Sequence, residues 1–96
     1  MIKGIVDIRD APYDTYVGRK NITYDLPESK WANPYLLHRD GTREEVCDKY
    51  EKHIRADKFL MESLHELDGK TLGCWCKSGK DPNKLCHGDI LIKLRN

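Results

Sequence analysis

Three of the four cysteines of this chain lie close together near its C-terminal end. They are Cys74, Cys76 and Cys86, and His87 directly follows the last of them. Thiolates and imidazoles serve as nucleophiles, bases and metal ligands, so their clustering within fourteen residues marks a candidate site. A strand-like run precedes the cluster and a helix-like run follows it. The pattern therefore predicts a loop that joins a strand end to a helix start and carries the chemistry of the protein.

The first interpretation of this cluster is a ligand site or a reactive-thiol site. Cys86 is expected at or just before a helix N-terminus, where amide dipoles stabilise an anion and lower the pKa of a thiol. Lys84 and a protonated His87 favour the thiolate in the same way. The same amides could instead bind a phosphate or a carboxylate. In an enzyme, Cys86 or Cys76 would be the nucleophile and His87 the base.

Two other interpretations stay open. Cys74, Cys76, Cys86 and His87 are four ligands of the kind that zinc prefers, although Cys-x-Cys and adjacent Cys-His are poor spacings for a tetrahedral site. An extended strand would place Cys74 and Cys76 on one face and Trp75 on the other, which suits a metal and core packing equally. In the packing interpretation, the cysteines are small buried apolar residues beneath the last helix. The spacing favours a protein without zinc or another cofactor.

A second group of candidate ligand residues precedes the cluster in the sequence. Arg19 and Lys20 follow a glycine and could hold phosphate oxygens. Trp31 lies in a proline-flanked loop, where it could stack on a base or sugar or plug the side of the core. Asn33 before Pro34 is typical of a turn, with base recognition as a second role. The full set of candidate ligand-binding residues is Arg19, Lys20, Lys30, Trp31, Asn33, Cys74, Trp75, Cys76, Cys86, His87, Gly88 and Asp89.

Charge is distributed unevenly along the 96 residues. The formal net charge is only +1, but residues 70–96 carry six Lys/Arg against two Asp/Glu, whereas residues 42–69 carry five against eight. The positive end contains the cysteine cluster, which favours a small anionic ligand that is nucleotide-like or sugar-phosphate-like. The basic residues are few and no aromatic ladder accompanies them, which argues against a nucleic-acid partner.

Length and composition predict a single domain over residues 1–96. No apolar run approaches the roughly 20 residues of a membrane span, so no membrane partner is expected. Asp7 interrupts the N-terminal apolar stretch at the point where a signal peptide would continue. We therefore expect a cytoplasmic protein whose cysteines stay reduced. The oligomeric state is left open.

Apolar runs separated by helical patterns predict the fold class. Residues 4–9 and 70–75 have the composition of main strands, and residues 15–17 that of a short one. This order predicts a small single-domain α/β sheet with at least one parallel strand pair, packed by about three helices. The carboxyl ends of parallel strands meet at one edge of the sheet, where α/β proteins usually bind ligands. The cysteine loop and Asp7 should therefore lie at the same edge.

Capping signals and apolar stripes predict the helices. Thr42 and Glu45 form a capping box, Asp57 can cap a second helix, and Leu85 or Cys86 begins the last one. The positions expected to face the core are Val46, Tyr50 and Ile54, then Phe59, Leu60, Leu64 and Leu67, and finally Ile90, Leu91 and Leu94.

Five short motifs occur in order along nearly the whole chain. They are Tyr16-Val17-Gly18-Arg19, the segment 29–35, the segment 40–46, Gly73-Cys74-Trp75-Cys76 and Cys86-His87-Gly88-Asp89. This combination resembles the DUF4326 family, whose members are small proteins of unknown function that are common in bacteriophages and bacteria. The Cys86-His87 ending is also distantly similar to that of the DUF488 proteins. The resemblance implies a phage or bacterial context and no established activity.

Three classes of function fit these observations. The first is a protein that binds a small anionic molecule, and the second is an enzyme that acts on such a molecule through Cys86 and His87. The third is a phage protein that blocks a host protein. No familiar nucleophile–base–oxyanion signature is present in the sequence, which favours binding.

Overall fold

A computed structural model describes residues 1–36, 38–74 and 86–96 of the chain. At its centre is a three-stranded sheet in the order β1-β3-β2. The outer strands β1 (Gly4–Asp7) and β2 (Thr15–Tyr16) both pair in parallel with β3 (Thr71–Cys74). The predicted parallel pairing of the first and last main strands is confirmed, and β2 adds a second parallel pair.

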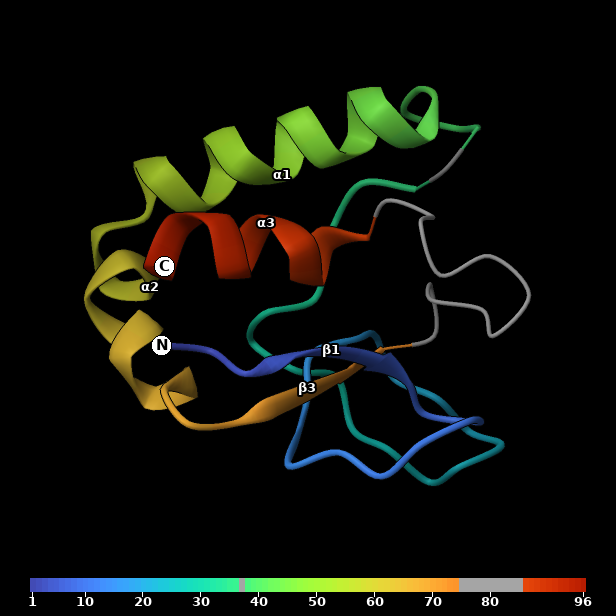
Figure 1. Cartoon of the computed structure of the whole chain (residues 1–96). Coiled ribbons are helices and arrows are strands. Elements are labelled where there is room, and N and C mark those ends of the chain that lie inside the picture. The colour runs from blue at the N-terminus through green and yellow to red at the C-terminus, as the bar shows by residue number, and fades with distance from the viewer. Residues whose placement is uncertain (37, 75–85) are drawn as a thin grey trace.

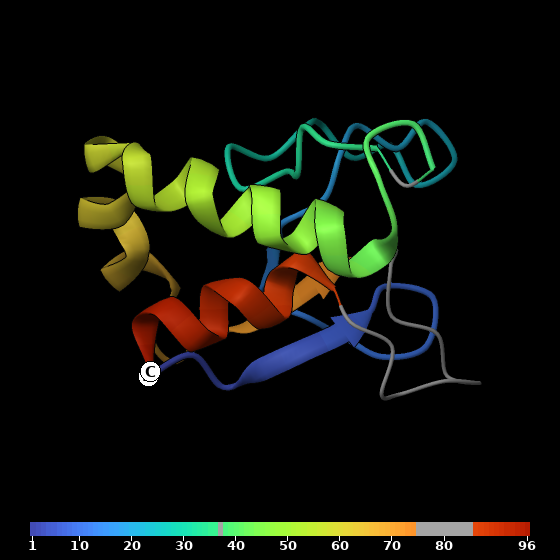
Figure 2. The same ribbon diagram turned by 90° about the horizontal axis from the view of Figure 1, so that it is seen from above.

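Two neighbouring helices and a short helical segment pack around the sheet. The last helix α3 (His87–Arg95) lies over the strands, and the long helix α1 (Arg43–Ala56) packs along α3, farther from the sheet (Figures 1 and 2). Between α1 and β3 the chain forms α2 (Lys58–Ser63) and the 3₁₀ helix η1 (Leu64–Leu67), near the start of β3 (Figure 1). This arrangement confirms a small α/β domain in which helices cover the sheet.

The predicted capping signals form as hydrogen bonds. The Thr42 hydroxyl accepts from the amide of Glu45 at 3.2 Å, and the Glu45 carboxylate accepts from the amide of Thr42 at 3.0 Å. Asp57 accepts from the amide of Leu60 at 3.1 Å and begins α2. These side chains satisfy amides that have no partner within the helix, which is why the helices start where the sequence predicts.

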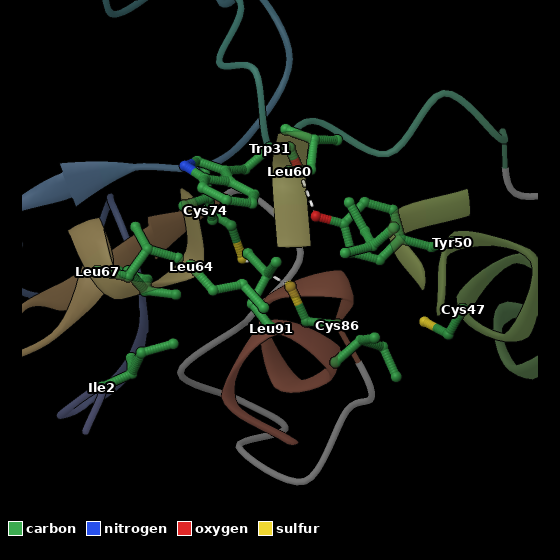
Figure 3. Packing of buried hydrophobic residues seen from close by; sticks show 14 residues of the cluster. Ile2, Trp31, Cys47, Tyr50, Leu60, Leu64, Leu67, Cys74, Cys86 and Leu91 are labelled. Atoms are coloured by element: carbon green, nitrogen blue, oxygen red, sulfur yellow. Dashed lines mark hydrogen bonds between the residues drawn. The ribbon is translucent and has the colours of Figure 1, made fainter. Parts of the chain in front are cut away.

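The core lies between β3 and the two long helices. Successive residues of a strand point to opposite faces, and Leu72 and Cys74 both face the helices and are fully buried. Figure 3 shows this cluster, which also contains Tyr50 and Leu91. On the other face of β3, a Cβ at Gly73 would lie only 2.5 Å from the ring of Tyr13. A glycine is therefore needed here to let the segment after β1 cover the sheet.

One of the expected core positions is wrong. Phe59 is 67% exposed, whereas Leu60, Leu64 and Leu67 are buried as predicted. The short α2 packs on the core along the side that carries Leu60, and Phe59, turned about 100° from it, lies on the outer side. Leu60 takes the inward place and Phe59 lies outside, where the Lys30 ammonium stands 5.6 Å from its ring centre.

Helix α3 is held at both of its ends. At the N-terminal end, Gly88 packs so tightly on Ile5 of β1 that an added Cβ would lie 2.4 Å from the Ile5 side chain. At the C-terminal end, the Asn96 side chain accepts from the amide of Ile2 at 3.0 Å and donates to the Ile2 carbonyl at 3.2 Å. The first contact fixes the start of α3 against the sheet, and the second ties its end to the segment before β1. Among the described residues, no helix is long and apolar enough to span a membrane.

Candidate functional site

The candidate site forms at the carboxyl edge of the sheet. Asp7 at the end of β1 is in register with Cys74 at the end of β3, and Tyr16 of β2 is in register with Gly73. Helix α3 starts beside them with Cys86 as its N-cap. A strand edge and a helix N-terminus therefore meet at the place that the sequence predicts for the site.

Two thiols meet at the centre of this edge. The sulfur atoms of Cys74 and Cys86 lie 2.8 Å apart, and one thiol donates to the other. Both residues are present as thiols, and they are 0% and 1% exposed. Figure 3 shows their side chains directed toward each other from β3 and from the start of α3. The fold thus brings together two cysteines that are twelve residues apart in the sequence.

Cys86 caps α3 with its sulfur. Its Sγ accepts from the amide of Gly88 at 3.5 Å, and the Asp89 carboxylate accepts from the amide of Cys86 at 2.9 Å. Together these bonds form a capping box. The positive end of the helix dipole favours a thiolate at this position. The side chains of Cys86 and Asp89 occupy the donors that an external phosphate or carboxylate would otherwise use.

His87 lies next to the thiols in a defined tautomer. Its Nε2 is 2.7 Å from the carbonyl oxygen of Val17, which can only accept a hydrogen bond, so Nε2 carries the hydrogen. In the neutral ring, the lone pair is then on Nδ1. Nδ1 is 3.8 Å from the sulfur of Cys86. A proton acceptor therefore faces the thiol, and the buried contact with Val17 orients it.

Tyr50 of α1 supports the imidazole from the other side. The two rings meet edge to face with 5.2 Å between their centres. The Tyr50 hydroxyl donates to the carbonyl of Trp31 at 2.6 Å. Burial, reinforced by the neighbouring thiols of Cys86 and Cys47, raises the pKa of Tyr50 far above its ordinary value. The phenol therefore stays protonated and remains a donor, which fixes the ring against His87.

A buried carboxylate also lies at this edge. Asp7 is 4% exposed and accepts from the backbone amide of Arg9 at 2.8 Å and from the Arg9 Nε at 2.9 Å. A second guanidinium nitrogen of Arg9 completes a bidentate pair. The carboxylate is thus neutralised from its own loop, and it holds the turn that follows β1.

Arg19 is near the site but is used to fasten a loop. Its Nε donates to the carbonyl of Asn33 at 3.0 Å, and an Nη donates to the carbonyl of Tyr35 at 2.7 Å. Asn33 is buried, with its amide group bonded to the Val46 carbonyl and to the amide of Tyr35. Both residues therefore have structural partners. Arg19 remains exposed, and it is only two residues from Val17, which contacts His87.

The remaining candidate residues of the long loop point to different places. Trp31 is 2% exposed and belongs to the hydrophobic cluster, so its ring plugs the core (Figure 3). The Lys30 ammonium pairs with Glu66 of η1 at 2.6 Å and is thereby turned toward that helix. Lys20 is exposed and lines a shallow hollow of about 470 Å³ beside the turn at 21–27. The Trp31 ring packs in the same buried cluster as Cys74 and Cys86 (Figure 3), whereas the structure does not gather the side chains of Lys20 and Lys30 around the thiols.

Two candidate residues, Trp75 and Cys76, lie outside the described residues. Among the residues that are described, no group of three or more His, Cys, Asp or Glu side chains is arranged to hold a metal ion. Every buried side-chain nitrogen or oxygen there has a hydrogen-bond partner. Cys47 is buried on α1, next to Val46 on the apolar side of that helix.

Sequence reasoning missed two groups that shape the site. One is the backbone carbonyl of Val17, which sets the tautomer of His87, and the other is the ring of Tyr50. Tyr50 carries a signal, because a tyrosine on the apolar stripe of a helix needs a buried partner for its hydroxyl. The carbonyl carries none, since any residue type at position 17 presents one.

The comparisons with known proteins place this arrangement in a family. A family model described as a domain of unknown function, DUF4326, matches residues 3–96. An uncharacterised protein of Acanthamoeba polyphaga mimivirus is 42% identical over 88 residues, which are 84% of this chain and 65% of that protein. The chain thus spans less than two thirds of that relative's length. No solved structure matches the chain. Because the family model covers residues 3–96, the chain belongs to the DUF4326 family.

Proposed function

We propose that the protein is a thiol-dependent enzyme that acts on a small anionic molecule, with Cys86 as its nucleophile and His87 as its general base. The observation that carries this proposal is the orientation of His87. Its Nε2 is committed to the Val17 carbonyl at 2.7 Å, so Nδ1 presents a lone pair to the Cys86 sulfur at 3.8 Å. Core packing alone requires no such arrangement of a buried thiol and a buried base.

The chemistry assigned to these groups is covalent catalysis. His87 Nδ1 accepts the thiol proton of Cys86, and the start of α3 stabilises the thiolate. The sulfur forms a bond to an electrophilic carbon of the substrate while the bond from that carbon to its leaving group breaks. The imidazolium returns its proton to the leaving group. Water, activated by the same imidazole, then cleaves the thioester or related intermediate and restores the thiol.

Charge supports an anionic substrate. Residues 70–96 carry six basic against two acidic residues, of which Lys93 and Arg95, in the last turn of α3, are paired with Glu51 and Asp68. The exposed Arg19 is only two residues from Val17, whose carbonyl binds His87. Because Cys86 is 1% exposed, the substrate must be small or must displace part of the chain to reach the sulfur.

A second candidate function is binding of a small anion without turnover. It is favoured by the exposed Arg19, which is two residues along the chain from the contact between Val17 and His87. The N-terminus of α3 argues against this function, because the side chains of Asp89 and Cys86 already accept from the amides of Cys86 and Gly88. In this function the thiols would be packing residues.

The test uses two acetyl donors that differ in charge. Acetyl phosphate is anionic and p-nitrophenyl acetate is neutral, and both transfer the same group. We expect acetylation of Cys86, found by peptide mapping, to be faster with acetyl phosphate at equal chemical reactivity. Cys86→Ser should lower the rate of protein acetylation by about 10³-fold or more. The matched control is Cys47→Ser, which removes a buried thiol of α1 and should leave the rate unchanged.

The two candidate functions give different results. Acetylation of Cys47 in place of Cys86, or no acetylation in a protein that circular dichroism shows to be folded, would contradict the enzyme proposal. A thermal shift with nucleotides or sugar phosphates that survives Cys86→Ser and disappears in Arg19→Ala would support binding alone. Arg19→Lys, which keeps the charge, separates loss of charge from loss of the loop contacts to Asn33 and Tyr35.

A further inference from the structure

The pair Cys74 and Cys86 has a property that neither nucleophilic catalysis nor anion binding requires. A nucleophile needs one thiol, yet the fold places a second sulfur 2.8 Å from the first. A disulfide bond is about 2.05 Å long, so the two sulfurs need to approach by less than about 1 Å. The residues come from a central strand and from a helix start. Cys74 is in register with Asp7 of β1, and the start of α3 is held by the close contact of Gly88 with Ile5.

We propose that Cys74 and Cys86 form a peroxide-responsive dithiol, which closes to a disulfide that joins the end of β3 to the start of α3. This inference goes beyond the proposed enzyme function and does not depend on it, because it rests on the geometry of the two thiols alone. Cys86 is the thiol that reacts first, since it lies at the helix N-terminus and faces Nδ1 of His87. Cys74 is the resolving thiol.

The reaction balances with hydrogen peroxide as the oxidant. The Cys86 thiolate attacks one oxygen of the peroxide, the O–O bond breaks, and a sulfenic acid and one water form. The Cys74 thiol then attacks the sulfenic sulfur, the S–O bond breaks, and a second water leaves. Two thiols and one peroxide thus yield one disulfide and two waters. A reducing thiol reverses the change by exchange through a mixed disulfide.

Burial selects the oxidant. Cys74 is 0% exposed and Cys86 is 1% exposed, so a bulky disulfide such as oxidised glutathione cannot align with either sulfur without local opening. Hydrogen peroxide is small enough to need much less opening. We therefore assign the pair to a response to peroxide and not to the disulfide of the glutathione pool.

Closure would change the site in three ways. The Cys86 sulfur would stop accepting from the amide of Gly88, would turn away from His87, and would lose its nucleophilic electron pair to the new bond. If the enzyme proposal is right, oxidation switches the activity off. If binding is the function, oxidation still rigidifies the joint between β3 and α3.

The experiment maps thiols in the intact reduced protein after exposure to hydrogen peroxide. The remaining thiols are blocked with N-ethylmaleimide and the digest is read by mass spectrometry. We expect the loss of two of the four thiols, a peptide that links Cys74 to Cys86, and full recovery with dithiothreitol. Oxidised glutathione at equal concentration should give much less of this peptide.

Variants separate this pair from the other cysteines. In Cys47→Ser, peroxide should still oxidise two thiols. In Cys74→Ala, it should oxidise only the Cys86 thiol, and dimedone should trap the resulting sulfenic acid. A link from Cys86 to Cys76 or Cys47, or four intact thiols in the oxidised wild-type protein, would overturn the inference. The wild-type map does not depend on whether any variant folds. It also does not depend on acetyl transfer, so failure of the enzyme proposal and failure of the dithiol are distinguished.

Discussion

Helices α1 and α3 begin with the same pattern of hydrogen bonds but with different chemistry. In α1 the N-cap is Thr42, an exposed hydroxyl that exchanges bonds with Glu45. In α3 the N-cap is Cys86, a buried thiol, and Asp89 takes the place of the glutamate. Both helices are therefore started by a capping box, one facing solvent and one facing the core.

The difference shows what capping explains and what it does not. Threonine is among the preferred N-cap residues, so Thr42 needs no further reason. Cysteine is not, because sulfur is a weak acceptor, and the bond from Gly88 to Cys86 is long at 3.5 Å. Capping alone would favour serine, threonine or aspartate at position 86. We therefore attribute the cysteine at position 86 to its neighbours Cys74 and His87 and not to capping.

The two helix starts also differ at the second residue after the N-cap. The second residue after the N-cap is the exposed Glu44 in α1 and the buried Gly88 in α3. Glycine costs helix stability relative to most residues, so its presence points to a steric requirement. The side chain of Ile5 fills the space that a Cβ would need. The start of α3 is thus pressed onto β1, and this contact places Cys86 against Cys74.

The largest expected effect comes from removing the base that distinguishes α3 from α1. His87→Gln keeps an amide that can donate to the Val17 carbonyl but removes the proton acceptor at Nδ1. We expect acetylation of Cys86 by acetyl phosphate at neutral pH to fall by about 10²-fold or more. The rate should then rise with pH toward the ordinary cysteine pKa of about 8.5. The measurement is the pH profile of the acetylation rate.

His53→Gln is the matched control for that experiment. His53 is a histidine of α1 whose ring contacts the ring of Tyr35. Its replacement should leave the profile unchanged. Equal rates for the His87 variant and the wild type would mean that the imidazole is a packing group. The start of α3 would then differ from the start of α1 in structure but not in reactivity.

The next largest effect tests the steric difference. Gly88→Ala raises intrinsic helix propensity but drives a methyl group into Ile5. We expect a loss of about 1–3 kcal/mol in the free energy of unfolding, measured by urea denaturation. Glu44→Ala, at the equivalent position of α1, should change it by less than about 0.5 kcal/mol. Restored stability in the double variant Gly88→Ala, Ile5→Val would show that the clash is the cause.

A smaller effect is expected at the hydroxyl cap. Thr42→Ala removes the acceptor for the amide of Glu45 and should cost about 1 kcal/mol. In a domain of this size, that lowers the melting temperature by about 4–8 °C. Thr42→Ser should restore most of the loss, and neither change should affect acetylation of Cys86. A change in reactivity without a change in stability would contradict a purely structural role for this cap.

The smallest effect concerns pH at the same cap. The backbone amide of Thr42, followed by its hydroxyl, holds the pKa of Glu45 below the ordinary glutamate value. The carboxylate therefore stabilises the folded state above the unfolded pKa of about 4.3, and this contribution is lost as the pH falls through the lower folded pKa. Glu45→Gln should make the acid side of the stability curve slightly flatter. An unchanged curve would mean that the exposed bond is fully screened by solvent.

Local pattern was enough to predict most of the secondary structure. The caps at Thr42 and Asp57 and the stripe of Val46, Tyr50 and Ile54 were expected and are present. The strands expected at residues 4–9 and 70–75 do pair in parallel, over the shorter ranges 4–7 and 71–74. These features depend on spacing along the chain and on the satisfaction of nearby backbone groups. Phe59 was misplaced because the periodic pattern does not say how wide a side of α2 packs on the core, and that side reaches Leu60 but not Phe59.

The candidate site divides differently between sequence and structure. The amino-acid sequence by itself determined which residues carry reactive groups, their family motifs, and the edge of the sheet where the loop after β3 must end. Only the tertiary structure decided that Trp31 plugs the core, that Arg19 fastens a loop, and that Cys74, Cys86 and His87 meet. The reason is physical: a tautomer set by the Val17 carbonyl and two sulfurs 2.8 Å apart depend on how α3 packs on the sheet. That packing arises from contacts between residues far apart in the chain, which no local spacing encodes.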